Sequence, residues 1–226
     1  MLTPTATILG SQPPPSAYLE SYRVLRSSLM ALNEREPFTT ALITSARDRE
    51  GKTTITTNLG TVLGLAGQRT LLVDADFYGA GLTRTFDIPD DTPGFTDVCQ
   101  GEADLHDAIL TTEVDTLSVL PVGTARDMGP ELVAATSIGN TIDMLGDAAD
   151  YVFIDCTPMS GFGTATSLAP VVDLVLMVTV ARSDAMVVRR CIDDLEDQQA
   201  RFGGVIVNDV LPQDSVVHRA FHRYYQ

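Results

Sequence analysis

Short apolar runs recur along the chain and alternate with longer segments in which apolar residues are spaced for helices. The apolar runs cover residues 38–45, 70–76, 116–123, 150–158, 173–181 and 203–210. Runs of this length that are nearly all apolar are typical of strands buried on both faces of a parallel sheet. The pattern therefore predicts a mostly parallel sheet with helices between its strands.

Helical spacing is clearest over residues 17–32, where apolar residues recur every three or four positions. They are Leu19, Tyr22, Leu25, Leu29 and Leu32. Further helices are expected over residues 51–68, closed by Gly67, and over 94–101, 104–112, 129–149 and 183–201. Because strands alternate with helices, we expect a three-layer α/β fold with helices on both faces of the sheet.

The pattern indicates one domain rather than several. Residues 1–16 contain SQPPPS and predict an extended lead-in, whereas residues 17–226 predict a single domain with 212–226 as its C-terminal tail. The first residues lack the basic and apolar segments of a signal peptide, and no apolar run reaches the roughly 18 residues that a membrane span needs. Together with three widely spaced cysteines, these features predict a cytoplasmic protein.

The charge of the chain narrows the class of partner. Its 226 residues include 30 acidic and 15 basic side chains, for a formal net charge of −15. Binding to nucleic acid needs a basic surface, so we expect no nucleic-acid partner. Lys52 is the only lysine of the chain, and it lies in the segment GKTT. Its position indicates a functional role for this basic residue.

The segment SARDREGKTT, residues 45–54, has the context of a phosphate-binding loop, since it joins an expected strand to an expected helix. Backbone N–H groups from Glu50 and Gly51 to Thr54 would hold phosphates at the start of the helix. Lys52 would neutralise the β- and γ-phosphates, and the Thr53 hydroxyl would bind Mg²⁺. The pattern G-x-x-x-x-G-K-[ST] is incomplete, because Ala46 replaces its first glycine.

Acidic residues end two further apolar runs. LLVDAD supplies Asp74 and Asp76, and YVFIDCTP supplies Asp155. Since the carboxyl ends of parallel strands line one crevice, these three acids can converge on the phosphates held by the loop. The alternative is that they cap turns or helices at the ends of the strands.

These segments together resemble the bacterial tyrosine kinases, the cytoplasmic partners of polysaccharide co-polymerases, within the MinD/ParA-like group of deviant-Walker P-loop ATPases. ESYRVLRSSL matches the E-x-x-R-x-x-R helix of the kinases through Glu20, Arg23 and Arg26. EGKTTITTNLG resembles their Walker A segment, LLVDAD their second acidic motif and VFIDCTP their Walker B motif. The likeness runs from about residue 16 to the last residue, and it implies a P-loop NTPase fold.

The resemblance implies ATP and Mg²⁺ as cofactors and assigns a role to each acid. Asp74 and Asp155 would hold the water shell of the metal, and Asp74 or Asp76 would accept the proton of the substrate tyrosine. Lys52 would bind phosphate, and Asn208, in the segment GVIVN, would contact the adenine.

The resemblance also implies partners and products. The kinase would phosphorylate Tyr224 and Tyr225 in the tail of its own or a neighbouring chain and regulate exopolysaccharide or capsule biosynthesis. Glu20, Arg23 and Arg26 would form the contact through which copies close into a ring. A membrane-embedded polysaccharide co-polymerase or adaptor would recruit the protein to the inner face of the membrane.

Several residues depart from the kinase pattern and keep two alternatives open. Asp48 and Arg49 replace a usual Pro-Gly before Glu50, the segment FYGAG lacks the arginine that usually follows D-x-D, and Thr164 replaces a usual aspartate. Arg47 stands where the MinD/ParA group carries a signature lysine. The alternatives are a MinD/ParA-like ATPase switch and a catalytically weak nucleotide-binding partner of a membrane protein.

Overall fold

The computed structural model describes residues 17–128, 131–132, 138–160 and 163–211. Its centre is a seven-stranded sheet with the strand order β3-β4-β2-β5-β1-β6-β7. The strands are β1 (Thr40–Ser45), β2 (Thr70–Ala75), β3 (Leu110–Thr111), β4 (Leu117–Leu120), β5 (Tyr151–Cys156), β6 (Leu174–Val180) and β7 (Phe202–Asn208). All neighbouring strands are parallel except β3 and β4.

The six apolar runs form six of these strands, as the sequence predicts. The seventh strand, β3, was not expected, because its residues fall within the helix predicted over 104–112. That helix ends early in the structure. Only α5 (Leu105–Ala108) is helical there, and Leu110 and Thr111 pair antiparallel with Val119 and Ser118 of β4. The prediction over 104–112 was therefore wrong in its second half, where pairing with the neighbouring β4 replaces the helix.

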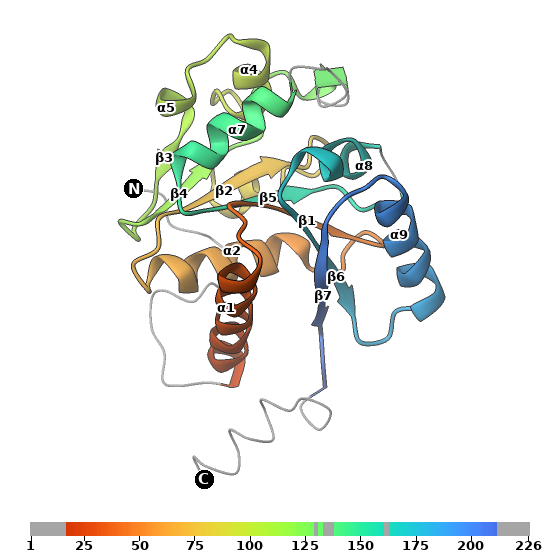
Figure 1. Ribbon diagram of the computed structural model, residues 1–226. Helices are drawn as coiled ribbons and strands as arrows, with labels where there is room; N and C mark the ends of the chain where they lie inside the picture. Colours follow the sequence, from red (N-terminus) through yellow and green to blue (C-terminus); the bar gives the residue numbers. More distant parts are fainter. Residues whose placement is uncertain (1–16, 129–130, 133–137, 161–162, 212–226) are drawn as a thin grey trace.

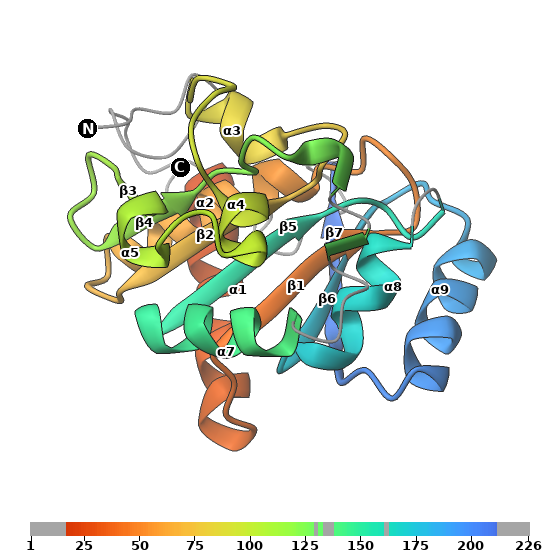
Figure 2. The same ribbon diagram turned by 90° about the horizontal axis from the view of Figure 1, so that it is seen from above.

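Helices cover both faces of the sheet, which confirms the three-layer fold (Figures 1 and 2). One face packs against α1 (Ala17–Arg35), α2 (Lys52–Gly64) and α3 (Gly81–Thr85). The other packs against α4 (Phe95–Gln100), α5, α7 (Ile138–Ala148), α8 (Thr164–Leu168) and α9 (Ala185–Asp197). Two short 3₁₀ helices, η1 (Arg126–Met128) and η2 (Ala169–Val171), complete the elements named here.

The apolar pattern explains how these layers form. Along β5, Val152 and Ile154 belong to the core on the α7–α9 side, whereas Phe153 belongs to the core on the α1–α2 side. Successive side chains of a strand point to opposite faces, so a fully apolar strand supplies both cores. On α1, Tyr22 and Leu29 are buried against the second core, as their spacing predicts.

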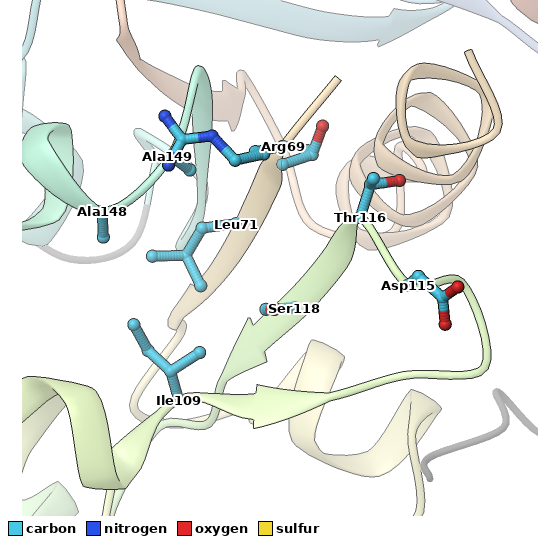
Figure 3. A pocket seen from close by; sticks show the side chains of 9 residues that line it. Arg69, Leu71, Ile109, Asp115, Thr116, Ser118, Ala148 and Ala149 are labelled. Atoms are coloured by element: carbon cyan, nitrogen blue, oxygen red, sulfur yellow. The ribbon is translucent and has the colours of Figure 1, made fainter. Parts of the chain in front are cut away.

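The two ends of the sheet differ. The loop between β1 and α2 lies at the carboxyl end, with Asp74 and Asp155. At the amino end, a hollow of about 160 Å³ lies between the starts of β2 and β4 (Figure 3). There Leu71 and Ile109 point toward one another. Arg69, which also lines the hollow, donates from its guanidinium to Asp150 at 2.7 Å. Among the helices in the described part of the chain, none has the length and apolarity to cross a membrane.

Candidate active site

The phosphate loop leads from β1 into the first turn of α2. Gly51 caps this helix with φ of 94°, in the left-handed region that favours glycine. A Cβ atom at Gly51 would lie 2.2 Å from the Nδ2 atom of Asn208, so a side chain has no room here. Asn208 Nδ2 donates a hydrogen bond to the carbonyl of Glu50 at 3.1 Å. Asn208 therefore ties the end of β7 to the loop, in addition to the adenine contact expected for it.

The loop keeps a left-handed residue where the kinase pattern has glycine. Arg49 has φ of 61°, and its side chain and that of Asp48 are exposed. A residue other than glycine in this region costs roughly 1–2 kcal/mol. The left-handed conformation of Arg49 therefore carries a small cost in stability.

Glu50 braces the loop from inside. Its side chain is buried, and one carboxylate oxygen accepts hydrogen bonds from the hydroxyls of Thr179 and Ser183. The other oxygen accepts from the backbone N–H of Arg47 at 2.9 Å. The carboxylate of Glu50 is therefore engaged by the protein, which leaves its backbone N–H as the group to face a ligand.

The first turn of α2 presents the residues that the sequence predicts for phosphate and metal. Lys52 is 6% exposed, and its charge partly offsets the rise in the pKa of Asp155 that burial causes. Thr53 Oγ1 donates to Asp155 Oδ2 at 2.6 Å. Thr54 is exposed, and its carbonyl accepts a hydrogen bond from Asn58. The side chain of Arg47 is exposed at the start of the loop.

Adjacent strands bring two of the predicted acids together. Asp74 of β2 and Asp155 of β5 are partners in the parallel register, and both are completely buried. Asp74 accepts hydrogen bonds from the backbone N–H and the hydroxyl of Thr83, both at 2.8 Å. Asp155 Oδ1 is buried and has no hydrogen-bond partner among the described residues. Asp76 is only partly buried and accepts from the N–H of Gly79 at 2.8 Å.

The electrostatics of this pair are unusual for carboxylates. Burial, together with the charge of Asp74, raises the pKa of Asp155 to about 8. Burial raises the pKa of Asp74 to about 6, against the lowering effect of its hydrogen bonds from Thr83. A buried charge without a partner is costly, and a cation at this position would relieve that cost.

These residues fit Mg²⁺ bound together with a nucleotide. Mg²⁺ usually takes one or two protein oxygens and completes its shell with water and phosphate oxygens. The unpartnered oxygen of Asp155 and the hydroxyl of Thr53 supply such ligands beside the phosphate loop. No three His, Cys, Asp or Glu side chains converge as a metal site in the described ranges.

The structure adds residues that the sequence did not single out. Thr83 fixes Asp74, while Thr179 and Ser183 fix Glu50. Gly81 leaves space beside Thr53 and Asp155, because a Cβ atom there would lie 2.4 Å from Thr53 Oγ1. Hydroxyl residues are common throughout the chain, so only the folded structure distinguishes Thr83, Thr179 and Ser183 from the others.

The residues predicted for assembly divide into two groups. Arg23 and Glu20 form an exposed pair at 3.3 Å on α1. Arg26 instead turns onto the domain, where its Nη1 atom donates to the carbonyl of Val62 in α2 at 3.2 Å. The predicted acceptors Tyr224 and Tyr225 lie outside the described residues.

Comparisons with known proteins agree with this geometry. The model of a family described as an AAA domain matches residues 43–195. The tyrosine-protein kinase CpsD of Streptococcus agalactiae is 33% identical over 169 residues, which cover 74% of this chain and 74% of that protein. The succinoglycan biosynthesis transport protein ExoP of Rhizobium meliloti is 30% identical over 199 residues, 86% of this chain and 25% of that protein.

Solved structures show the same fold. The kinase domain of the Escherichia coli tyrosine kinase ETK superposes with a TM-score of 0.79 at 25% identity, over 88% of this chain and 78% of that one. The septum site-determining protein MinD from Pyrococcus horikoshii, complexed with Mg-ADP, gives a TM-score of 0.66 at 25% identity, over 81% and 76%. The phosphate loop, the paired acids and these relatives together place the chain in the family of bacterial tyrosine kinases, which are P-loop proteins of the deviant-Walker group.

Proposed function

We propose that the protein transfers the γ-phosphate of ATP to tyrosine hydroxyls and thereby regulates the assembly of exopolysaccharide or capsule. The observation that carries this proposal is the buried pair Asp74 and Asp155 beside Thr53, with one oxygen of Asp155 unpartnered. An enzyme of phosphoryl transfer works mainly by positioning and by compensating charge, and this site is arranged for both.

Each residue of the site would contribute one function. The backbone N–H groups from Gly51 to Thr54 would hold the phosphates at the start of α2, and Lys52 would balance their charge. Thr53 and Asp155 would hold Mg²⁺, and Asp74 would support its water shell. When bound, the metal would supply positive charge against the charge that develops on the phosphates.

Asp76 is better placed than Asp74 to accept the proton of the tyrosine. Both oxygens of Asp74 are engaged, by Thr83 and by the backbone N–H of Asp76. Asp76 is partly exposed and keeps one carboxylate oxygen beyond its bond to Gly79. A general base must reach the substrate hydroxyl, which favours the partly exposed Asp76 over the buried Asp74.

The acceptors and the assembly are further parts of the proposal. Tyr224 and Tyr225 would be phosphorylated, with copies of the chain arranged in a ring so that each tail reaches a neighbouring site. The exposed Arg23 and Glu20 pair would contribute to the contact between copies, whereas Arg26 would hold α1 on α2. A membrane-embedded polysaccharide co-polymerase or adaptor would bring the protein to the membrane.

One experiment tests the proposed activity. Purified protein with Mg²⁺ and ATP is followed for phosphotyrosine by mass spectrometry and for released phosphate in the same sample. We expect phosphotyrosine on Tyr224 or Tyr225, and we expect Lys52→Ala to abolish it because the β- and γ-phosphates lose their balancing charge. Protein that binds ATP but forms no phosphotyrosine would contradict the proposal.

A MinD/ParA-like ATPase switch is the second candidate. The exposed side chain of Arg47 favours it, because this residue occupies the position of the signature lysine of that group, while its backbone N–H is held by Glu50. This function predicts phosphate release without phosphotyrosine in the same experiment, and loss of that release in Arg47→Ala.

A further inference from the structure

An apolar groove lies between α9 and the edge strand β7, on the face of the sheet opposite α2. It has a volume of about 350 Å³, and its lining includes Val180, Val188, Ile192 and Val207. β7 pairs only with β6 in the described sheet, so it forms one edge (Figures 1 and 2). The groove is separate from the metal ligands, which lie on β2, β5 and α2.

The apolar side chains of β7 in this region are unusually exposed. Val207 is 51% exposed and Val205 is 41% exposed. Ile206, between them, packs against the core on the α1–α2 side, so alternation directs Val205 and Val207 to the α9 side. Two neighbouring valines on an uncovered edge of a sheet are typical of a docking surface.

We propose that the tail of the same chain, residues 212–226, docks in this groove. The described chain ends at Leu211, four positions after Val207, so the tail begins beside the groove. A segment attached this closely has a high effective concentration, on the order of millimolar, for a site within its reach. The proposal does not depend on the kinase activity.

The chemistry of the tail suits the groove. Its sequence, PQDSVVHRAFHRYYQ, contains apolar Val216, Val217 and Phe221. It also carries two arginines and one aspartate, in a chain whose net charge is −15. On α9, Arg189 lines the groove and pairs with Asp193 at 2.8 Å, and the same helix carries Asp194, Glu196 and Asp197 with exposed side chains. Apolar side chains would fill the groove while the arginines face the acidic helix.

The groove also borders the brace of the phosphate loop. Thr179 and Ser183 line it, and both donate hydrogen bonds to the carboxylate of Glu50. A docked tail would therefore contact groups that hold the loop in shape. Docking or release of the tail could therefore change the conformation of the phosphate loop through Thr179, Ser183 and Glu50.

Photo-crosslinking of the full chain tests the docking. The photoreactive amino acid p-benzoylphenylalanine replaces Phe221, the protein is irradiated without nucleotide, and crosslinked peptides are mapped by mass spectrometry. We expect crosslinks within one chain to residues 180–192 of β6 and α9 or 205–207 of β7. Val207→Asp should reduce their yield by about tenfold or more, because it places a charge in the apolar groove.

A matched variant controls for nonspecific effects. Met144→Asp changes an apolar residue of similar exposure, 49%, on α7 and should leave the crosslinks unchanged. Crosslinks that map elsewhere, or that Val207→Asp leaves intact, would overturn the proposal. So would crosslinks between chains whose yield falls on dilution, since the groove would then receive a second copy rather than the tail of the same chain.

Discussion

The two ends of the central sheet hold aspartates in opposite electrostatic states. At the carboxyl end, Asp74 and Asp155 are completely buried and their pKa values are raised to about 6 and about 8. At the amino end, burial alone would raise the pKa of Asp173, but hydrogen bonds from Thr40 and Thr39 outweigh it and hold that pKa below its usual value. Burial therefore disfavours the charged form of the aspartates at the carboxyl end, whereas hydrogen bonds stabilise the charged form of Asp173 at the amino end.

This difference indicates what each end contributes. Asp173 accepts the backbone N–H groups of Thr39 and Thr40 at 2.9 and 2.8 Å and so fixes the start of β1. Asp155 keeps an unpartnered buried oxygen, which lowers the stability of the protein without ligand. Such a cost is typical of sites that become satisfied only when a ligand binds.

The largest expected effect comes from making the same substitution at both ends. Asp155→Asn should reduce phosphoryl transfer on the order of a hundredfold or more, because a charged metal ligand is lost. It should also raise the free energy of unfolding of the nucleotide-free protein by about 1–3 kcal/mol, because a costly buried acid is removed. Activity assays and chemical denaturation measure the two effects.

Asp173→Asn is the matched control for that comparison. It weakens charged hydrogen bonds to the backbone and should lower the free energy of unfolding by about 1 kcal/mol, with activity retained. If both substitutions change stability in the same direction, the contrast between the two ends is wrong.

The second expected effect is steric and concerns the affinity for nucleotide when Gly81 gains a side chain. Gly81→Ala would place a Cβ atom 2.4 Å from Thr53 Oγ1 and 3.2 Å from Asp155 Oδ2, so the hydroxyl that faces the metal must move. We expect the affinity for Mg²⁺ and ATP to fall about tenfold, because the orientation of a proposed metal ligand is disturbed. Calorimetric titration measures the affinity.

A glycine near the other end provides the control. Gly146→Ala in α7 would place its Cβ atom 3.7 Å from Thr40 Cγ2, an ordinary contact. It should leave nucleotide affinity unchanged and stabilise the helix by about 0.5–1 kcal/mol. Equal loss of affinity in both alanine variants would show that Gly81 has no special role at the metal ligands.

A smaller effect is expected in the dependence of stability on pH. The pKa of Asp155 is raised above its usual value near 3.8 to about 8, so the folded state binds more protons than the unfolded state between these values. Its contribution to stability is present at low pH and is lost as the pH rises toward 8. Asp173, with its lowered pKa, contributes above its usual value and loses that contribution as the pH falls below it.

Denaturation of the nucleotide-free protein between pH 5.5 and 8.5 measures this dependence. The native protein should lose about 1–3 kcal/mol more than Asp155→Asn over the range, because only the native protein carries the titrating acid. Parallel curves for the two proteins would contradict the assignment of the raised pKa to Asp155.

The sequence predicted the sheet well because its signal is local. Six apolar runs became six strands, since a strand buried on both faces needs apolar residues at every position. β3 was missed because two residues, Leu110 and Thr111, carry no periodicity and depend on pairing with β4. The Asp74 and Asp155 pairing was predictable in outline, because both acids end parallel strands.

Other features of the site depend on contacts between distant segments. Glu50 is expected to bind the cofactor through its backbone N–H, and the structure adds that its carboxylate binds Thr179 and Ser183, about 130 positions away in the chain. The contact of Arg26 with a neighbouring copy stays a prediction, and the structure adds its bond to the carbonyl of Val62 within its own chain. No spacing in the sequence encodes either contact.

The most direct test of the central claim is the number of protons released when Mg²⁺ and ATP bind. Binding of a cation beside Asp155 should lower its raised pKa, so the acid should release a proton near pH 7. Calorimetric titrations in two buffers of different ionisation enthalpy count these protons. We expect a net release of several tenths of a proton or more, retained in Asp173→Asn and reduced in Asp155→Asn. Binding without proton release in the native protein would contradict the account.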